Sequence, residues 1–96
     1  MRRLIALALC LAACDSPSPQ MRGAQATHFE AEGHAMTLRR DGNSVEVIRH
    51  GYAPRSVQPR LRPAMAQAMT DLTGCTIRAG TLEGDTGVLR AKLNCP

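Results

Sequence analysis

The sequence predicts a small α+β domain in which one helix packs on a four-stranded sheet, in the order ββαββ. Two observations predict it. Apolar and polar residues alternate in the segments 36–47 and 75–95, and between these segments apolar residues recur at every third or fourth position. Alternation is typical of strands with one buried face, and the wider spacing is typical of an amphipathic helix. We therefore expect two layers, with an antiparallel or mixed sheet and one disulfide.

The composition sets the size of the core. The chain has 96 residues, of which one is phenylalanine, one is tyrosine and none is tryptophan. The interior must therefore be built from aliphatic side chains and methionine, which bury less area per residue than aromatic side chains do. We expect one folded domain over residues 27–96, and a domain of this size and composition needs a covalent staple.

The first fourteen residues have the layout of an export signal. Arg2 and Arg3 precede a short apolar run over residues 4–9, and the sequence Leu-Ala-Ala follows directly before Cys14. This layout resembles the lipobox of bacterial lipoproteins, which are cleaved by signal peptidase II. The resemblance implies that residues 1–13 are removed and that Cys14 carries acyl chains. An uncleaved anchor and ordinary secretory cleavage without lipid are the two alternatives.

The resemblance also implies where the domain works. A lipidated Cys14, followed by a flexible tether to residue 26 that is rich in proline and serine, would hold the domain on a membrane of the bacterial cell envelope, facing the periplasm. Asp15 weakly favours the inner membrane over the outer one, and the choice stays open. Cys10 would leave with the signal and Cys14 would be acylated, so Cys75 and Cys95 alone would keep free thiols.

The first hairpin is predicted around the dipeptide Asp41–Gly42. If these two residues form the turn, Leu38 lies opposite Val45, and all apolar side chains of the hairpin share one face. Phe29 falls on the opposite phase of this pattern. A β-bulge at Gly33 would bring it back to the apolar face.

The helix is predicted to follow a proline-rich connector over residues 52–63 and to run to about Thr73. Pro59 or Pro63 suits its first turn, because the missing N–H costs nothing there. Gly74 is placed to end the helix in the left-handed conformation. One apolar stripe faces the sheet, formed by Leu61, Met65, Ala68, Met69 and Leu72.

The second hairpin is predicted over residues 75–95, with 83–87 as its turn. A register centred on Asp85 pairs Ile77 with Leu93 and also places Cys75 opposite Cys95. We therefore expect a structural disulfide between these two cysteines. A redox-active pair is disfavoured, because such cysteines usually lie two residues apart.

Basic residues are concentrated between Glu46 and Asp71, a stretch without any acidic residue, in a chain of formal net charge +4. A surface of this kind could contact anionic lipid. The alternative is a solvated loop and helix start. The candidate basic surface consists of Arg49, Arg55, Arg60 and Arg62.

No motif indicates catalysis or a cofactor. His34 and His50 are expected on opposite faces of the sheet and His28 far along a strand, so we expect no metal site. Nucleophile elbows and phosphate-binding glycine loops are missing, and two aromatic residues cannot build a stacking platform for nucleic acid. The sequence thus predicts no enzyme, no cofactor, no bound nucleic acid and no small-molecule substrate.

Three functions follow as hypotheses. The first is a membrane-tethered binding or assembly module for an envelope protein, with an edge strand near Phe29 or Val88 accepting a strand of the partner. The second is a basic module that contacts anionic lipid or another acidic envelope polymer. The third is a small enzyme or metal carrier.

Overall fold

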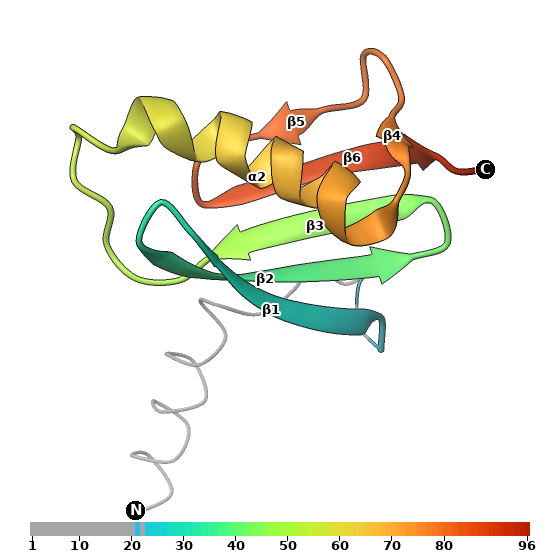
Figure 1. Cartoon of the computed structure of the whole chain (residues 1–96), viewed down its shortest axis with the longest axis horizontal. Helices are drawn as coiled ribbons and strands as arrows, with labels where there is room; N and C mark the ends of the chain where they lie inside the picture. The colour runs from blue at the N-terminus through green and yellow to red at the C-terminus, as the bar shows by residue number, and fades with distance from the viewer. Residues whose placement is uncertain (1–20, 22) are drawn as a thin grey trace, which may run out of the picture.

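The computed structural model of the chain describes Met21 and residues 23–96. The expected signal peptide, Cys14 and most of the expected tether lie outside the described residues. In the described part of the chain, three strands come before the long helix α2 and three strands follow it (Figure 1). They are β1 (Gln25–Ala31), β2 (His34–Asp41), β3 (Ser44–Arg49), α2 (Gln58–Thr73), β4 (Thr76–Ile77), β5 (Glu83–Gly84) and β6 (Val88–Asn94).

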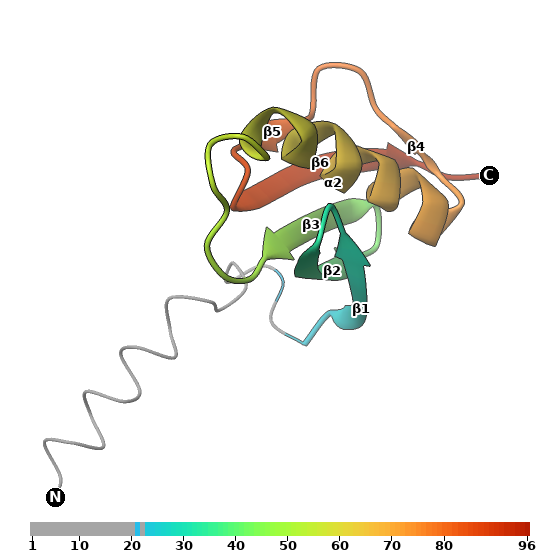
Figure 2. The same ribbon diagram turned by 60° about the vertical axis from the view of Figure 1, so that its left-hand side comes forward.

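The α+β class is confirmed, but the sheet has six strands and not four. Its order is β1-β2-β3-β6-β4, with β5 also paired to β6, and every pairing is antiparallel. The helix α2 covers one face of this sheet (Figure 2). The two additional strands are β1, which extends the first hairpin, and β5, which lies within the region expected to be a turn.

The strand β1 begins at Gln25, two residues before the expected start of the domain. A two-residue turn, Glu32–Gly33, joins it to β2, and the register runs without interruption from Ala31↔His34 to Gln25↔Arg40. The prediction of a β-bulge at Gly33 is therefore wrong. Phe29 lies opposite Met36, on the face of the core, because a two-residue turn reverses the chain so that odd-numbered positions face even-numbered ones.

The turn between β2 and β3 also differs from the expectation. It is formed by Gly42 and Asn43, so that Leu38 lies opposite Val47 and not opposite Val45. Gly42 has a φ of 59°. A positive φ at the first central position is the requirement of the type II′ turn, which matches the twist of the strands, and glycine meets it without strain. The pairing moved by two residues, an even number, so the apolar face stayed as predicted.

The helix α2 spans Gln58–Thr73, so it begins within the segment 52–63 that was expected to be the connector. Pro59 lies in its first turn, one of the two positions predicted for a proline there, and Pro63 lies inside the helix. Gly74 ends it in the left-handed conformation, as predicted, and its N–H donates to the carbonyl of Thr70 at 2.9 Å. Four of the five predicted stripe residues are buried. Leu72 is not, since 44% of it is exposed.

The second hairpin follows the predicted register at β4, with Ile77 opposite Leu93, but the pairs of β5 with β6 are shifted from it by three residues. The Cys75–Cys95 disulfide is present, and its Cα atoms lie 4.5 Å apart. Glu83 and Gly84, expected in the turn, instead pair with Arg90 and Leu89 as β5. Gly84 is required there, because a Cβ at this position would lie 2.2 Å from the carbonyl oxygen of Val88.

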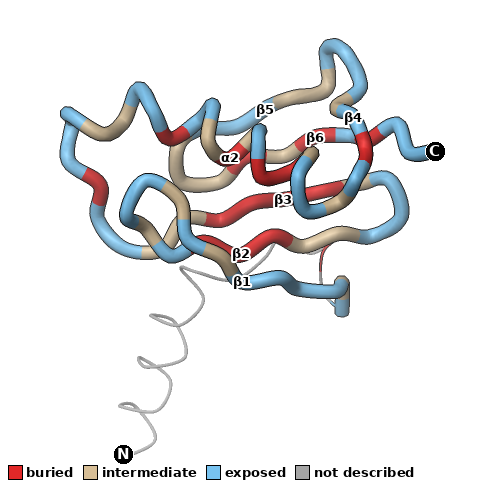
Figure 3. Tube along the Cα trace, viewed as in Figure 1, coloured by how far each residue is buried: buried red, intermediate tan, exposed pale blue. Residues whose placement is uncertain are grey.

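The core lies between α2 and the sheet, and the central strands β2, β3 and β6 carry most of it (Figure 3). The opposite face of the sheet also holds buried residues. Thr37 and Glu46 are each 1% exposed, Ile48 is 3% exposed, and Met21, just before β1, is 3% exposed as well. The folded part therefore includes a residue that the sequence had assigned to the tether.

Candidate functional site

The outer edge of β1 is the first candidate site. Residues that flank a two-residue hairpin turn exchange hydrogen bonds, so Ala31, and with it Phe29 and Thr27, bond to β2. The backbone N–H and C=O groups of the alternate residues, Ala26, His28 and Glu30, then point away from the sheet. Among the described residues, no backbone hydrogen bond is made along this outer edge.

This edge lacks the usual protection against pairing with another chain. Natural edge strands are short, or carry lysine, proline or a bulge. The strand β1 has seven residues, QATHFEA, with a continuous register and one charged side chain, Glu30. Its first four residues are exposed, while the middle residues of β2 and β3 are buried (Figure 3).

The other edge of the sheet is protected. The strand β4 has two residues, and the adjacent Cys75 is tied to Cys95, just beyond β6. Val88, the second expected edge position, lies in β6 opposite Ile48 of β3. Its carbonyl accepts the N–H of Asp85 at 2.9 Å. Of the two predicted positions, Phe29 therefore lies on an open edge and Val88 does not.

The structure assigns different surroundings to the four predicted basic residues. The guanidinium of Arg49 donates to the carbonyl of Thr86 at 2.8 Å and to that of Gly51 at 3.3 Å, so it holds together the two segments that follow β3 and β5. This arginine therefore has a structural role in the fold. Arg49 is half-buried, and the N–H groups that make these bonds are not available to a ligand.

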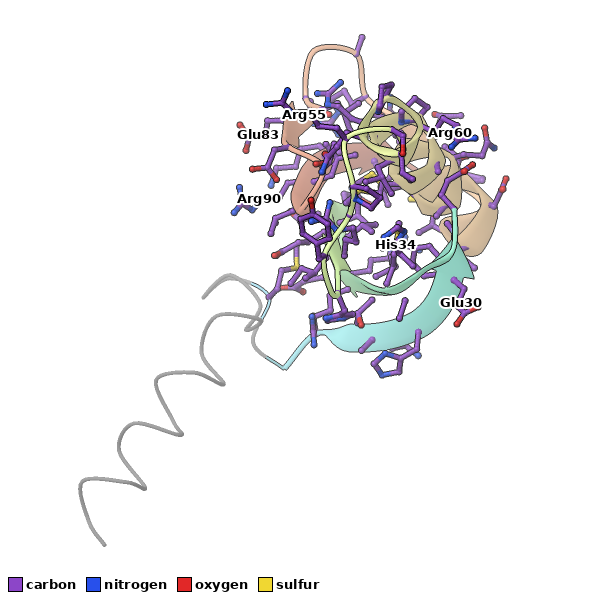
Figure 4. All side chains as sticks on the ribbon, turned by 90° about the vertical axis from the view of Figure 1, so that its left-hand side faces the viewer. Glu30, His34, Arg55, Arg60, Glu83 and Arg90 are labelled. Carbon is purple, nitrogen blue, oxygen red and sulfur yellow. A yellow bond between two sulfur atoms is a disulfide. The ribbon has the colours of Figure 1, made fainter. Side chains whose placement is uncertain are left out.

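The remaining three arginines surround the start of α2 but do not converge. Arg60 faces Glu32 at 3.9 Å, and both side chains are partly exposed. Figure 4 shows Arg55 and Arg60 projecting on different sides, with Arg55 on the side of Glu83. Within the described part of the chain, the side chains of Arg55 and Arg62 have no hydrogen-bond or ion-pair partner.

The histidines are arranged in a way that the sequence did not indicate. Nδ1 of His28 lies 3.0 Å from the hydroxyl oxygen of Thr37, and Nε2 of His50 lies 2.8 Å from the same oxygen. His34 lies on the other face, where its ring nitrogens contact the carbonyls of Glu32 at 2.9 Å and Tyr52 at 3.1 Å. The contact between His28 and Thr37 could have been predicted from the register of β1 and β2, which places these two residues directly opposite each other.

These histidines do not assemble a metal centre with other ligands. Over Met21 and residues 23–96, no group of three or more His, Cys, Asp or Glu side chains is placed to hold a metal ion. Two imidazoles and a buried hydroxyl leave a metal short of the three or four protein ligands that zinc sites use.

A row of alternating charges crosses the face of the sheet opposite α2. Arg39 in β2 pairs in register with Glu46 in β3, Glu46 with Arg90 in β6, and Arg90 with Glu83 in β5. Opposite charges in directly facing positions stabilise an antiparallel sheet. This row therefore supports the fold, and its charges compensate one another.

The turn between β5 and β6 is organised by Asp85. Its carboxylate accepts the N–H groups of Val88 at 2.9 Å and Gly87 at 2.7 Å. These bonds stabilise the ionised form, so the backbone N–H of Val88, followed by that of Gly87, lowers the pKa of Asp85 below its ordinary value of 3.8. The sequence signal was the spacing Asp-x-Gly, which is typical of a side chain that caps its own turn.

Comparison with known proteins finds no matching family model, no matching curated protein and no matching solved structure. No helix in the described part of the chain is long and apolar enough to cross a membrane.

Proposed function

We propose that this protein is a membrane-tethered module of the bacterial envelope that binds a protein partner by adding a strand of that partner to β1. The observation that carries the proposal is the asymmetry of the sheet. One edge is short and covalently closed, whereas the other offers a seven-residue strand whose outward backbone groups have no partner among the described residues. Unpaired strand edges are templates for pairing with an extended segment.

The side chains around β1 indicate what the partner strand should look like. Phe29 is half-buried and lies on the face of the core, whereas Glu30 is exposed on the other face. A partner with an apolar residue beside Phe29 and a basic residue beside Glu30 would complete both faces. The free backbone groups supply the affinity, and these two positions supply the selectivity.

The proposed anchor would keep the binding edge near the membrane. The residues 15–20 separate Cys14 from the buried Met21, and an extended chain of this length spans at most about 20 Å. This tether is shorter than the one predicted from the sequence, which runs to residue 26. The module would therefore act on partners in the same membrane or close to its surface.

Photo-crosslinking in cells of the native host tests the strand-addition proposal. A photoreactive amino acid at Thr27, an exposed position of β1, should give one discrete protein adduct, and the same amino acid at the exposed Thr76 of β4 should not. Ala26→Pro, which removes an outward N–H without touching the bonds to β2, should abolish the adduct from position 27. Glu30→Lys should weaken it. Adducts of equal yield from positions 27 and 76, or an adduct unaffected by Ala26→Pro, would contradict strand addition.

The anchor has its own test. Mass spectrometry of the protein from its native host should find Cys14 as the first residue, carrying acyl chains. Cys14→Ser should move the protein from the membrane fraction to the soluble fraction. An intact first residue, or an unmodified Cys14, would overturn the anchor without affecting the argument on β1.

A second candidate function is the electrostatic one, in which Arg55 and Arg62 contact anionic lipid. The lack of side-chain partners for these two arginines among the described residues favours it, while the guanidinium of Arg49 is held by its bonds to Gly51 and Thr86. Co-sedimentation of the Cys14→Ser protein with anionic vesicles should then fall steeply between low and high salt, because exposed charges are screened. Co-sedimentation that does not change with salt would exclude this candidate.

A further inference from the structure

A groove of about 430 Å³ lies between the first half of α2 and the segment that carries Leu82 and Thr86. Its lining is mainly apolar and comes from Pro59, Pro63, Ala66 and Leu82. Both the volume and the apolar character are typical of sites that bind small molecules.

The groove uses a face of α2 that the core leaves free. The core stripe occupies one side of the helix, with Leu61, Met65 and Met69 fully buried. A second set of residues recurs at helical spacing on another side and faces the groove. That set consists of Pro59, Arg62, Pro63 and Ala66.

Most polar groups in the groove are already satisfied. The hydroxyl of Thr86 donates to Oε1 of Gln58, and Nε2 of Gln58 donates to the carbonyl of Ala53 at 3.1 Å. The carbonyl of Thr86 accepts from Arg49. Arg62 is the charged residue of the lining, and its guanidinium has no hydrogen-bond or ion-pair partner within the described part of the chain.

We propose that this groove binds a single-chain anionic amphiphile of the fatty-acid type. The alkyl chain would lie over Pro63, Ala66 and Leu82, and the carboxylate would accept hydrogen bonds from Arg62. A guanidinium binds a carboxylate through two parallel bonds, so one arginine is enough to hold the head group. A small hydrophilic anion would gain nothing from the apolar lining, and a purely apolar molecule would leave the guanidinium unused. This inference does not depend on the edge of β1.

Titration with octanoate, followed by amide NMR spectra, tests the proposal. The full chain is used with Cys14→Ser, so that no acyl chain of its own competes. We expect saturable shifts at Ala66, Leu82 and Thr86 and none at the exposed Tyr52. Arg62→Gln should weaken binding by roughly tenfold, since a charge-assisted pair is lost. Arg55→Gln, which removes an equal charge outside the groove, should change it less than twofold.

The uncharged analogue 1-octanol separates the two parts of the site. Octanol should bind the unchanged protein more weakly than octanoate does. It should bind the Arg62→Gln protein and the unchanged protein with the same affinity. Shifts that do not saturate, or equal weakening by Arg62→Gln and Arg55→Gln, would overturn the proposal in favour of unspecific attraction. Binding of anionic vesicles that depends equally on both arginines, without octanoate binding, would overturn it in favour of a bilayer contact.

Discussion

The imidazoles of His28 and His50 meet at one hydroxyl group, that of Thr37. The two histidines come from opposite sides of β2, and Thr37 between them is 1% exposed. A hydroxyl has one hydrogen and two lone pairs, so it donates to one imidazole and accepts from the N–H of the other. The contact therefore ties β1 to the end of β3 across the strand that separates them.

Thr37→Val should lower the free energy of unfolding by about 1 kcal/mol, which is the net value of a typical hydrogen bond. Valine has the same shape and a high strand propensity, so the loss would report the hydroxyl alone. Chemical denaturation measures it. Thr27→Val, an exposed position in β1 that has no side-chain hydrogen bond, serves as the control and should stay within about 0.5 kcal/mol of the unchanged protein. Equal effects of the two substitutions would contradict a role for the hydroxyl.

Glu32→Asn should raise the free energy of unfolding by about 1 kcal/mol. Glu32 has a φ of 52°, in the left-handed region that side chains other than asparagine and glycine enter at a cost, and Asn-Gly is the preferred sequence of this two-residue turn. The lost contact with Arg60 is exposed and contributes little. Thermal unfolding measures the change.

Glu32→Gln is the matched control for that substitution. It removes the same charge but keeps an ordinary side chain in the left-handed conformation, so its melting temperature should not rise. A rise of equal size in both variants would assign the gain to the charge and not to the backbone.

Removal of the disulfide by Cys75→Ala with Cys95→Ala should lower the free energy of unfolding by about 3 kcal/mol, the value for a closed loop of this length. The two cysteines are 20 residues apart. Denaturant unfolding of the double variant provides the measurement, and the unchanged protein with reductant should lose a similar amount. A loss below about 1 kcal/mol in both experiments would show that the bond does not support the fold.

Asp85 should titrate below its ordinary pKa of 3.8, because its ionised form accepts the N–H groups of Val88 and Gly87. A lowered pKa in the folded state means that this carboxylate stabilises the fold above pH 3.8 and that its contribution is lost as the pH falls through the lowered pKa. Carbon-detected NMR of the carboxyl group measures the midpoint directly. A midpoint at or above 3.8 would be incompatible with the two backbone bonds.

Stability curves of Asp85→Asn between pH 7 and pH 2 supply the control. Asparagine can still accept the same N–H groups but does not titrate. Its curve should therefore fall less steeply with acid than that of the unchanged protein. Parallel curves would indicate that Asp85 has the same pKa in the folded and unfolded chains.

The sequence by itself determined the α+β class, the presence of α2 and its left-handed end at Gly74, and the pairing of Cys75 with Cys95. These features depend on local periodicity and on the register of one hairpin, which neighbouring residues encode. The tertiary structure alone decided that β1 extends the sheet, that His28 and His50 meet at Thr37, and that Arg62 faces Leu82 across a groove. Such relationships join segments far apart in the chain, and a change of one residue in a turn shifts or removes them. Periodicity indicates which face of an element is buried, but only the packing decides which element lies next to it.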